Sequence, residues 1–434
     1  MKSRFLRLWV ISVPLSVASP DEGSGAFHCY RVYLTLAVFH ILKLCIKSRP
    51  PNSDFNRKNY KFCYFCGRNL AYMSLLLSEE NSVFSQLSSF GHQKVVFCSD
   101  PETGLKAIIA IHDTTLGPAL GGTRMWAYKT EAEALHDVLR LSRGMTYKAS
   151  ITGLNLGGGK AVIIGDNRAD KSEALMRRYG RFIKNLNGSF ITAEDVGTTP
   201  RDMEYIRMET QHVTGVPESL GGSGDPSPVT AKGVYMGIKA CVKEVFGTDS
   251  LAGRTVAVQG IGNVGENLVY LLREENAKVY ISDINEERLG YVSKKYGAEA
   301  VANNSVYDLD IDIYAPCALG ATVNSETIEK LNCAIIAGAA NNQLANEDIH
   351  GKLLLEKGIV YAPDYLINAG GLINCYSEIA GFSKQRTMQL AENIYEATRN
   401  VLKKSKADNI PTHEAANKIA EKRIEDIRKI KATY

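Results

Sequence analysis

Short apolar runs alternate with stretches of helical periodicity along most of this chain, beginning near Met73. Runs rich in β-branched residues predict buried strands, whereas apolar residues three and four positions apart predict helices with one buried face. The predicted strands span residues 94–98, 106–112, 161–164, 189–193, 254–259, 278–283, 311–315, 334–337 and 359–361. Strands that alternate with helices are typical of α/β proteins with parallel sheets.

Capping residues and apolar spacing predict the helices between these strands. Thr130 and Glu133 have the spacing of a capping box, and the helix that follows is expected to end near Arg143. Thr199 and Pro200 open another helix, because proline is well tolerated in the first turn. Further helices are predicted over residues 171–186, 229–246 and 266–275, and from 388 to the end with a break at 408–411. Residues 116–126, LGPALGGTRMW, are interpreted as turn-prone.

A stretch rich in glycine and proline divides this pattern in two. Residues 221–228 read GGSGDPSP and form the clearest linker in the chain. Since 434 residues are enough for two hydrophobic cores, the expected fold is α/β with two domains separated by a cleft. We expect the first domain over residues 73–225, the second over 226–375, and helices over 376–434 that return to the first domain.

The first 72 residues differ from the rest in charge and pattern. They carry 11 Lys and Arg against 3 Asp and Glu, whereas the remaining residues carry 40 against 44. An apolar run over 8–18 has the outline of a secretory signal interrupted by proline. A second run, over 30–46, contains Arg31, His40 and Lys43, which are costly inside a bilayer. We therefore expect the native product to begin at Met73, with residues 1–72 as a dispensable extension.

Composition excludes several classes of function for the main body. Its slight negative charge offers no basic face of the kind that binds nucleic acid. Its five cysteines are isolated, without the spacing of disulfides or zinc sites, which suits a reducing cytoplasm. Cys63 and Cys66 form a lone CxxC that we attribute to chance. We expect no metal, no nucleic acid and, for residues 73–434, no membrane as a partner.

GIGNVG (260–265) lies between a predicted strand and a predicted helix, with Asp283 eighteen residues past its last glycine. This context predicts a doubly wound Rossmann domain, in which glycines let pyrophosphate reach the unpaired amides of a helix N-terminus. Asp283 can accept hydrogen bonds from the adenosine ribose and would repel a 2′-phosphate, so NAD is favoured over NADP. A structural βαβ unit without ligand is the less favoured alternative. The motif predicts cofactor contacts from Gly260, Ile261, Gly262, Asn263, Val264, Gly265 and Asp283.

Small residues and amides follow three later strands, in APCALG (315–320), GAANNQ (338–343) and NAGG (368–371). Parallel sheets gather their loops along one edge, so these amides are expected around the nicotinamide. Asn341 and Asn342 are also compatible with simple helix capping.

A second glycine-rich stretch, GLNLGGGK (153–160), follows Lys148 and is interpreted as a tight turn before a strand. Bare glycine backbone lets a small ligand approach, and Lys148 and Lys160 can converge on one anion. A phosphate loop would need Ser or Thr after its lysine, but Ala161 follows. The alternative is that this stretch binds no ligand and forms a structural turn, with Lys160 as a surface cation. Glu194 and Asp195 end the strand 189–193, where loops and chemistry commonly gather.

Six segments in one order resemble a known family: LGPALGG (116–122), GMTYK (144–148), GLNLGGGK (153–160), ITAEDVGT (191–198), APCALGA (315–321) and AGAANNQL (337–344). In them the chain resembles the glutamate, leucine, phenylalanine and valine dehydrogenases, and most of all the bacterial leucine dehydrogenase branch. The resemblance covers about residues 96–427 and none of the first 72.

This resemblance implies roles for residues already noted. Lys148 would bind the substrate α-carboxylate, Lys160 would be the catalytic lysine, and Asp195 would handle protons at the amino group. The chemistry agrees, because a lysine beside another cation in a closed cleft can act as a base near neutral pH. Thr230 and Asn341 would hold the nicotinamide carboxamide. The residues implied to line the substrate pocket are Leu120, Gly121, Ala193, Leu372 and Cys375.

The family implies NAD-dependent, reversible oxidative deamination of branched-chain L-amino acids to 2-oxo acids, ammonia and NADH. Glutamate would need a further cation, and phenylalanine more room than Leu120 and Leu372 leave. Leu372 and Cys375 stand where leucine dehydrogenases usually have valine, so the ranking among leucine, isoleucine and valine is open. Alternatives are a valine or phenylalanine dehydrogenase and, with less support, a non-catalytic NAD-binding regulator. A cytoplasmic homo-oligomer is implied, with an octamer as the expected number.

Overall fold

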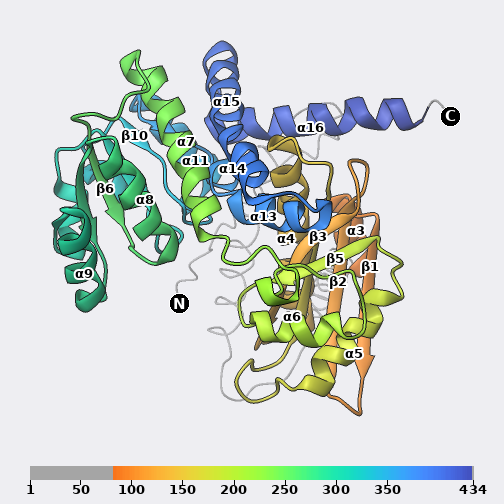
Figure 1. Cartoon of the computed structure of the whole chain (residues 1–434). Helices are drawn as coiled ribbons and strands as arrows, with labels where there is room; N and C mark the ends of the chain where they lie inside the picture. Colours follow the sequence, from red (N-terminus) through yellow and green to blue (C-terminus); the bar gives the residue numbers. More distant parts are fainter. Residues whose placement is uncertain (1–81, 433–434) are drawn as a thin grey trace, which may run out of the picture. The chain divides into compact units, whose positions relative to one another are not determined.

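The computed structural model describes residues 82–432 of the chain. The predictions about residues 1–72, which include the start at Met73 and the CxxC pair, lie outside the described residues. Within 82–432 the chain forms two α/β domains, each built on its own sheet (Figure 1). None of the described helices combines the length and apolarity that a bilayer crossing requires.

The first sheet has five strands in the order β1-β2-β4-β3-β5. Strand β2 runs antiparallel to both β1 and β4, whereas β3 runs parallel to β4 and β5. The sheet is therefore mixed, and the carboxyl ends of β3, β4 and β5 lie at one edge. The strands are β1 Lys94–Asp100, β2 Leu105–Asp113, β3 Ala119–Trp126, β4 Gly157–Ile164 and β5 Phe190–Glu194.

Both faces of this sheet are covered by helices. Alternate residues of β2 point to opposite faces, as a strand requires. Ile109 and Ile111 pack in the cluster that contains residues of α5 (Glu173–Lys184) and α6 (Pro200–Arg207). Ile108 and Ala110 pack instead with the apolar stripe of α4 (Glu131–Ile151). Helix α4 thus lies on the face opposite α5 and α6.

Three local predictions in this domain are wrong. Helix α4 continues past Arg143 to Ile151, because the residues beyond Gly144 bury against β4. Residues 116–126 are not mainly turn, since they contain β3, and residues 157–160 are the first half of β4 rather than a turn. Glycine here serves close packing between strands: a Cβ on Gly121 would lie 1.7 Å from the carbonyl oxygen of Gly159.

The second sheet is parallel throughout, in the order β11-β10-β9-β6-β7-β8. Numbered from β6, this is the strand order of the doubly wound dinucleotide-binding fold, so the predicted fold class is confirmed. The strands are β6 Thr255–Gln259, β7 Lys278–Ser282, β8 Glu299–Ala300, β9 Ile313–Pro316, β10 Ile335–Ile336 and β11 Val360–Tyr361.

Helices cover both faces of this sheet too. Val256 and Val258 pack in the cluster that includes α7 (Ser227–Phe246) and α8 (Asn263–Glu274), whereas Ala257 packs in the cluster on the other face. The remaining elements are α3 Val83–Phe90, η1 Glu218–Leu220, α9 Glu286–Tyr296, η2 Asn303–Asp308, α10 Ser325–Lys330, α11 Glu347–Glu356 and α12 Asp364–Ile367.

The C-terminal helices are α13 Gly370–Ala380, α14 Lys384–Glu392, α15 Ile394–Asp408 and α16 Thr412–Lys431. Helices α13, α14 and α15 pack against α7, and α16 packs against α4 of the first domain. The Arg423 guanidinium fastens this contact by donating to the carbonyls of Ser150 at 3.1 Å and Leu154 at 2.9 Å. Helix α16 thereby holds the loop that joins α4 to β4.

Candidate active site

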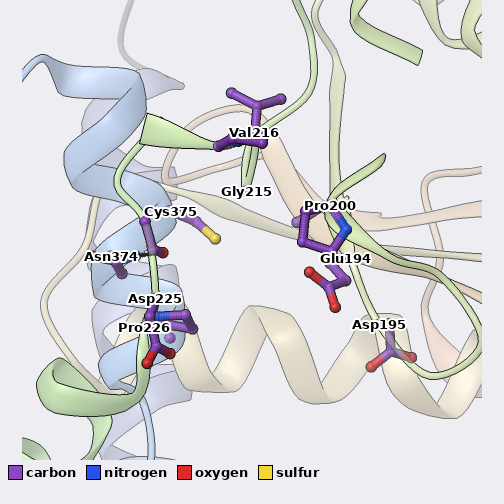
Figure 2. A pocket seen from close by; sticks show the side chains of 13 residues that line it. Glu194, Asp195, Pro200, Gly215, Val216, Asp225, Pro226, Asn374 and Cys375 are labelled. Atoms are coloured by element: carbon purple, nitrogen blue, oxygen red, sulfur yellow. Dashed lines mark hydrogen bonds between the residues drawn. The ribbon is translucent and has the colours of Figure 1, made fainter. Parts of the chain in front are cut away.

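A cavity of about 700 Å³ lies between the end of β5 and the start of α13. Its lining comes from residues 193–195, 215–217 and 224–226, together with Pro200, Gly371, Asn374 and Cys375. Figure 2 shows Glu194 and Asp195 on one side and Asn374, Cys375 and Asp225 on the other. Both domains therefore contribute to one cavity, and three of the predicted site residues, Ala193, Asp195 and Cys375, line it.

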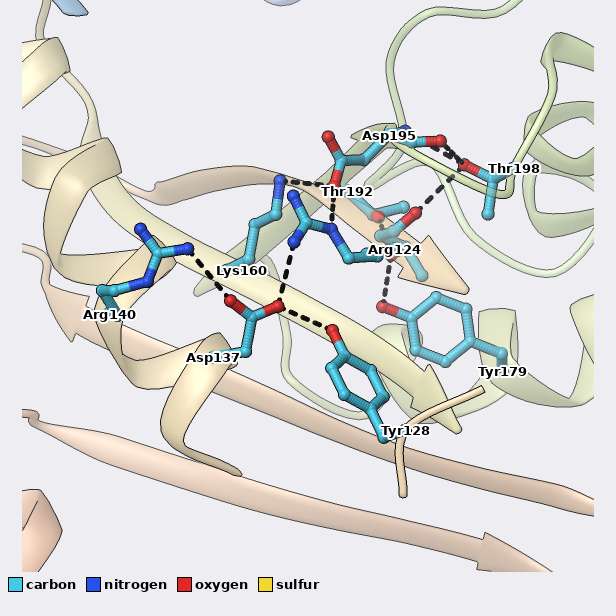
Figure 3. Close-up of polar contacts among 10 residues, drawn as sticks. Arg124, Tyr128, Asp137, Arg140, Lys160, Tyr179, Thr192, Asp195 and Thr198 are labelled. Carbon is cyan, nitrogen blue, oxygen red and sulfur yellow. Dashed lines mark hydrogen bonds and ion pairs between the residues drawn. The ribbon is translucent and has the colours of Figure 1, made fainter. Parts of the chain in front are cut away.

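Asp195 pairs with two cations through a single oxygen. Its Oδ2 lies 3.0 Å from the Lys160 ammonium and accepts a hydrogen bond from Arg124 Nε at 3.1 Å (Figure 3). Its backbone N–H donates to Thr198 Oγ1 at 3.0 Å. Burial raises the pKa of Asp195, but Lys160 and Arg124 outweigh burial and hold that pKa below its ordinary value. The other oxygen, Oδ1, has no hydrogen-bond partner among residues 82–432.

Lys160 lies in the middle of β4, opposite Ala110 of β2, and is only 6% exposed. Burial lowers its pKa, Asp195 opposes this, and Arg124 adds to the lowering. Burial also lowers the pKa of Lys148 to about 8, against the opposing charge of Asp364 and with a further contribution from Lys160. The two lysines thus lie near enough for their charges to interact.

Glycines in β4 allow close packing on the strand, with Gly158 against α4 and Gly159 against Phe190 of β5. A Cβ on Gly158 would lie 2.1 Å from the backbone nitrogen of Thr146, and one on Gly159 would lie 2.7 Å from the Phe190 ring. Thr146 precedes Lys148 by two residues, and Gly158 precedes Lys160 by two. The glycine run therefore sets the distance between the two lysines.

Asp364 of α12 was missed by sequence reasoning. It is 5% exposed and accepts backbone hydrogen bonds from Gln343 at 3.1 Å and Tyr365 at 2.6 Å. Helix α12 packs on α4, and Asp364 is the principal negative charge acting on Lys148. No sequence signal links it to Lys148, more than two hundred positions earlier.

A second unpredicted contact joins α13 to the linker. Glu378 Oε2 accepts hydrogen bonds from the backbone of Gly215 at 3.1 Å, and from the backbone and hydroxyl of Ser223 at 3.1 and 3.0 Å. Asn374 Nδ2 donates to Ser223 Oγ at 2.9 Å and to the Gly224 carbonyl at 3.2 Å. The glycine-rich linker is consequently fastened to α13 from both sides.

The GIGNVG segment forms an open turn after β6. Gly260 has a left-handed φ of 93°, and a Cβ there would lie 2.7 Å from the Ala318 nitrogen. A Cβ on Gly262 would meet no heavy atom within 4 Å. Helix α8 begins at Asn263 without a side-chain cap, three residues earlier than predicted. Its free amides and the open space suit a bound pyrophosphate. Asp283, just after β7, accepts a hydrogen bond from the Ile261 backbone at 2.8 Å.

The remaining predicted residues come from both domains. Asn368 Nδ2 donates to Asn341 Oδ1 at 2.8 Å. The Thr230 hydroxyl donates to the Pro226 carbonyl at 3.0 Å, and a Cβ on Gly370 would lie 2.3 Å from the Thr230 Cα. Leu120 and Leu372 belong to the same hydrophobic cluster, at 1% and 7% exposure, and Gly121 adjoins Leu120 in β3. These last three do not line the cavity, whereas Cys375 does.

No cluster of three or more metal-ligating side chains occurs among the residues that the structure describes.

Residues 92–212 match the family model of the Glu/Leu/Phe/Val dehydrogenase dimerisation domain. Residues 221–287 and 280–431 match the glutamate/leucine/phenylalanine/valine dehydrogenase model.

Individual relatives agree with these family matches. Leucine dehydrogenase of Bacillus cereus is 56% identical over 352 residues, which are 81% of this chain and 96% of that protein. Phenylalanine dehydrogenase of Thermoactinomyces intermedius is 48% identical over 353 residues, 80% and 96% of the two chains. The crystal structure of L-tryptophan dehydrogenase from Nostoc punctiforme has a TM-score of 0.74 at 46% identity, covering 80% of this chain and 99% of that one. The chain therefore belongs to the Glu/Leu/Phe/Val dehydrogenase family of NAD(P)-dependent amino-acid dehydrogenases.

Proposed function

We propose that this protein is a leucine dehydrogenase, which oxidatively deaminates branched-chain L-amino acids with NAD. The observation that carries the proposal is the Lys160–Asp195 pair at 3.0 Å, with Asp195 on the wall of a cavity that both domains line. In each turnover the amino acid, NAD and water give a 2-oxo acid, ammonium, NADH and a proton.

Each polar group has a defined task in this reaction. Lys148, when protonated, binds the substrate carboxylate, and NAD held at the GIGNVG turn would supply the acceptor for the Cα hydride. Lys160, whose pKa is lowered by burial, takes a proton from the water that attacks the iminium carbon. The free Oδ1 of Asp195 exchanges protons with the amino group as ammonia leaves. Thr230 and Asn341 would hold the carboxamide of the nicotinamide, next to the Asn341–Asn368 hydrogen bond.

The charge of the cavity argues against glutamate as the substrate. Its lining, as far as residues 82–432 contribute, contains the carboxylates Glu194, Asp195 and Asp225 but no Lys or Arg. Lys148 and Lys160 lie outside this lining and are assigned to the α-carboxylate and the attacking water, so a second, side-chain carboxylate would lack a counter-ion there and would be repelled. Apolar surface comes from Ala193, Val216, Pro217, Pro226 and Cys375. Because relatives include tryptophan and phenylalanine dehydrogenases at 47% and 48% identity, aromatic substrates are the main competitor.

A substrate panel tests this proposal directly. We expect purified protein to form NADH from leucine, isoleucine and valine with kcat/KM at least about tenfold above phenylalanine and tryptophan, and no turnover of glutamate. NADH absorbance with each amino acid at several concentrations measures it. Faster turnover of phenylalanine or tryptophan would replace the leucine assignment by an aromatic one. NADH binding without turnover of any amino acid would favour a non-catalytic role.

The choice of NAD over NADP is expected to depend on Asp283. Asp283→Asn keeps an acceptor for the Ile261 amide but removes the charge that would repel a 2′-phosphate. We expect the ratio of kcat/KM for NAD to that for NADP to fall by about tenfold or more. Initial rates with both cofactors measure the ratio, and kcat with saturating NAD serves as control. An unchanged ratio would remove Asp283 from cofactor selection.

Family resemblance also supplies expectations about the intact protein. We expect the first domain to bind substrate and mediate assembly, and the second to bind NAD. The domain boundaries at 225 and 375, the octameric state and the cytoplasmic location stay predictions.

A further inference from the structure

The Lys160–Asp195 pair continues outward as an unbroken series of charged contacts. Arg124 of β3 donates from Nε to Asp195 at 3.1 Å and from Nη1 to Asp137 of α4 at 2.9 Å. Asp137 also accepts from the Tyr128 hydroxyl at 2.7 Å and from Arg140 at 3.1 Å (Figure 3). The guanidinium thus lies between two carboxylates, one of them on the cavity wall and the other outside the cavity.

We propose that Arg124 is a positioning residue for Asp195, and that Asp137 is the counter-ion that adjusts how strongly Arg124 acts on the Lys160–Asp195 pair. This proposal rests on the proposed function for its consequence in turnover, but the charge arrangement itself does not. None of the resemblances or family matches above gives Arg124 or Asp137 a role.

Geometry favours a positioning role for Arg124. The planar guanidinium offers separate donors in a rigid fork, so it can hold two carboxylates at fixed angles. It occupies Oδ2 of Asp195 together with Lys160, which leaves Oδ1 for the substrate. Thr198 accepts from the Asp195 backbone and donates to the Thr123 carbonyl at 3.0 Å. Residues of β3 therefore hold both the main chain of Asp195, through Thr198, and its carboxylate, through Arg124.

The charges around Lys160 determine in which direction each substitution should shift its pKa. Lys160 is faced by Asp195 after β5, by Arg124 on β3, and by Asp137 and Lys148 on α4. Arg124 lowers the pKa of both Lys160 and Asp195. Asp137 raises the pKa of Lys160 and neutralises part of the Arg124 charge. Removing Arg124 should therefore raise the pKa of Lys160, and removing the Asp137 charge should lower it.

Two substitutions with opposite expected effects test the proposal. For leucine oxidation we expect Arg124→Met to lower kcat by about tenfold or more and to move the acid limb of the kcat/KM profile to higher pH. Asp137→Asn should move that limb to lower pH. We expect each of the two shifts to be about half a pH unit or more. Arg177→Met is the matched control, because Arg177 pairs with Glu173 and Glu209 away from the cavity and should leave the limb unmoved.

A second readout does not depend on turnover. Carbamylation of Lys160 by cyanate, followed by peptide mass spectrometry over a pH series, reports its charge state in each variant, with the exposed Lys106 as internal reference. We expect the Lys160 midpoint to rise in Arg124→Met and to fall in Asp137→Asn. If the wild-type protein turns over no amino acid but the Lys160 midpoints still shift as expected in the two variants, the positioning pair stands and the proposed function is rejected. Midpoints that stay fixed, or shift in the same direction in both variants, would overturn the inference and leave a merely structural ion pair.

Discussion

Lys160→Ala should abolish oxidative deamination while the protein still binds NADH. The alanine variant removes the only base that faces the iminium carbon in the proposed mechanism, so we expect kcat to fall by about 1,000-fold or more. Lys160 lies in the first domain and the dinucleotide motif in the second, so the affinity for NADH should change by less than about twofold. Steady-state NADH formation and NADH fluorescence titration measure the two quantities.

Lys171→Ala is a suitable control for the loss of an ion-paired, half-buried lysine. Lys171 donates to Asp202 at 2.8 Å and to the Gly197 carbonyl at 3.1 Å in the same domain, and it is not among the residues that line the cavity. Its kcat should stay within about threefold of wild type, since only an ion pair of modest energy is lost. Residual activity of Lys160→Ala within tenfold of wild type would reject Lys160 as the base. Recovery of activity on adding a small primary amine would support it, because the amine can enter the space that the side chain leaves.

The sequence predicted those features that depend on local pattern. Alternating and periodic apolar residues identified most strands and helices, because burial on one face of an element repeats with that element's period. GIGNVG and Asp283 were predicted together, since a turn between strand and helix has strict glycine requirements. The predicted residues Lys148, Lys160 and Asp195 lie close enough for their charges to act on one another, while their roles stay predictions.

Other features were not predicted. Some depend on residues that are far apart in the sequence, and others on glycine, which has no side chain that could show in a pattern. Glycines contribute nothing to an apolar pattern, so β3 and the first half of β4 were mistaken for turns. Arg124 lies in that supposed turn, and its partner Asp137 lies on a helix that was predicted without reference to its charged residues. Asp364 and Glu378 act on residues more than one hundred and fifty positions earlier. Only tertiary packing creates such pairs, and no short-range pattern records them.

Gly158→Ala should disrupt both folding and substrate binding, since the added methyl group meets backbone. Its Cβ would lie 2.1 Å from the nitrogen of Thr146 and 2.6 Å from the Cα of the same residue. Thr146 cannot turn away easily, because its hydroxyl lies 2.8 Å from His112 Nδ1 in a hydrogen bond. Helix α4 must then move away from β4, which we expect to cost about 3 kcal/mol of unfolding free energy.

The same displacement separates the two lysines that the mechanism requires. A shift of about 1 Å between catalytic groups can lower rates by about 100-fold, so we expect kcat/KM for leucine to fall by that factor, with most of the loss in KM because Lys148 moves. Gly144→Ala is the matched control on α4, since its Cβ would meet nothing within 4 Å and alanine favours the helix by up to about 1 kcal/mol. Thermal unfolding and initial rates of both variants test the argument. Wild-type stability and KM in Gly158→Ala would mean that β4 and α4 can repack freely, and that the glycine run does not set the spacing of Lys148 and Lys160.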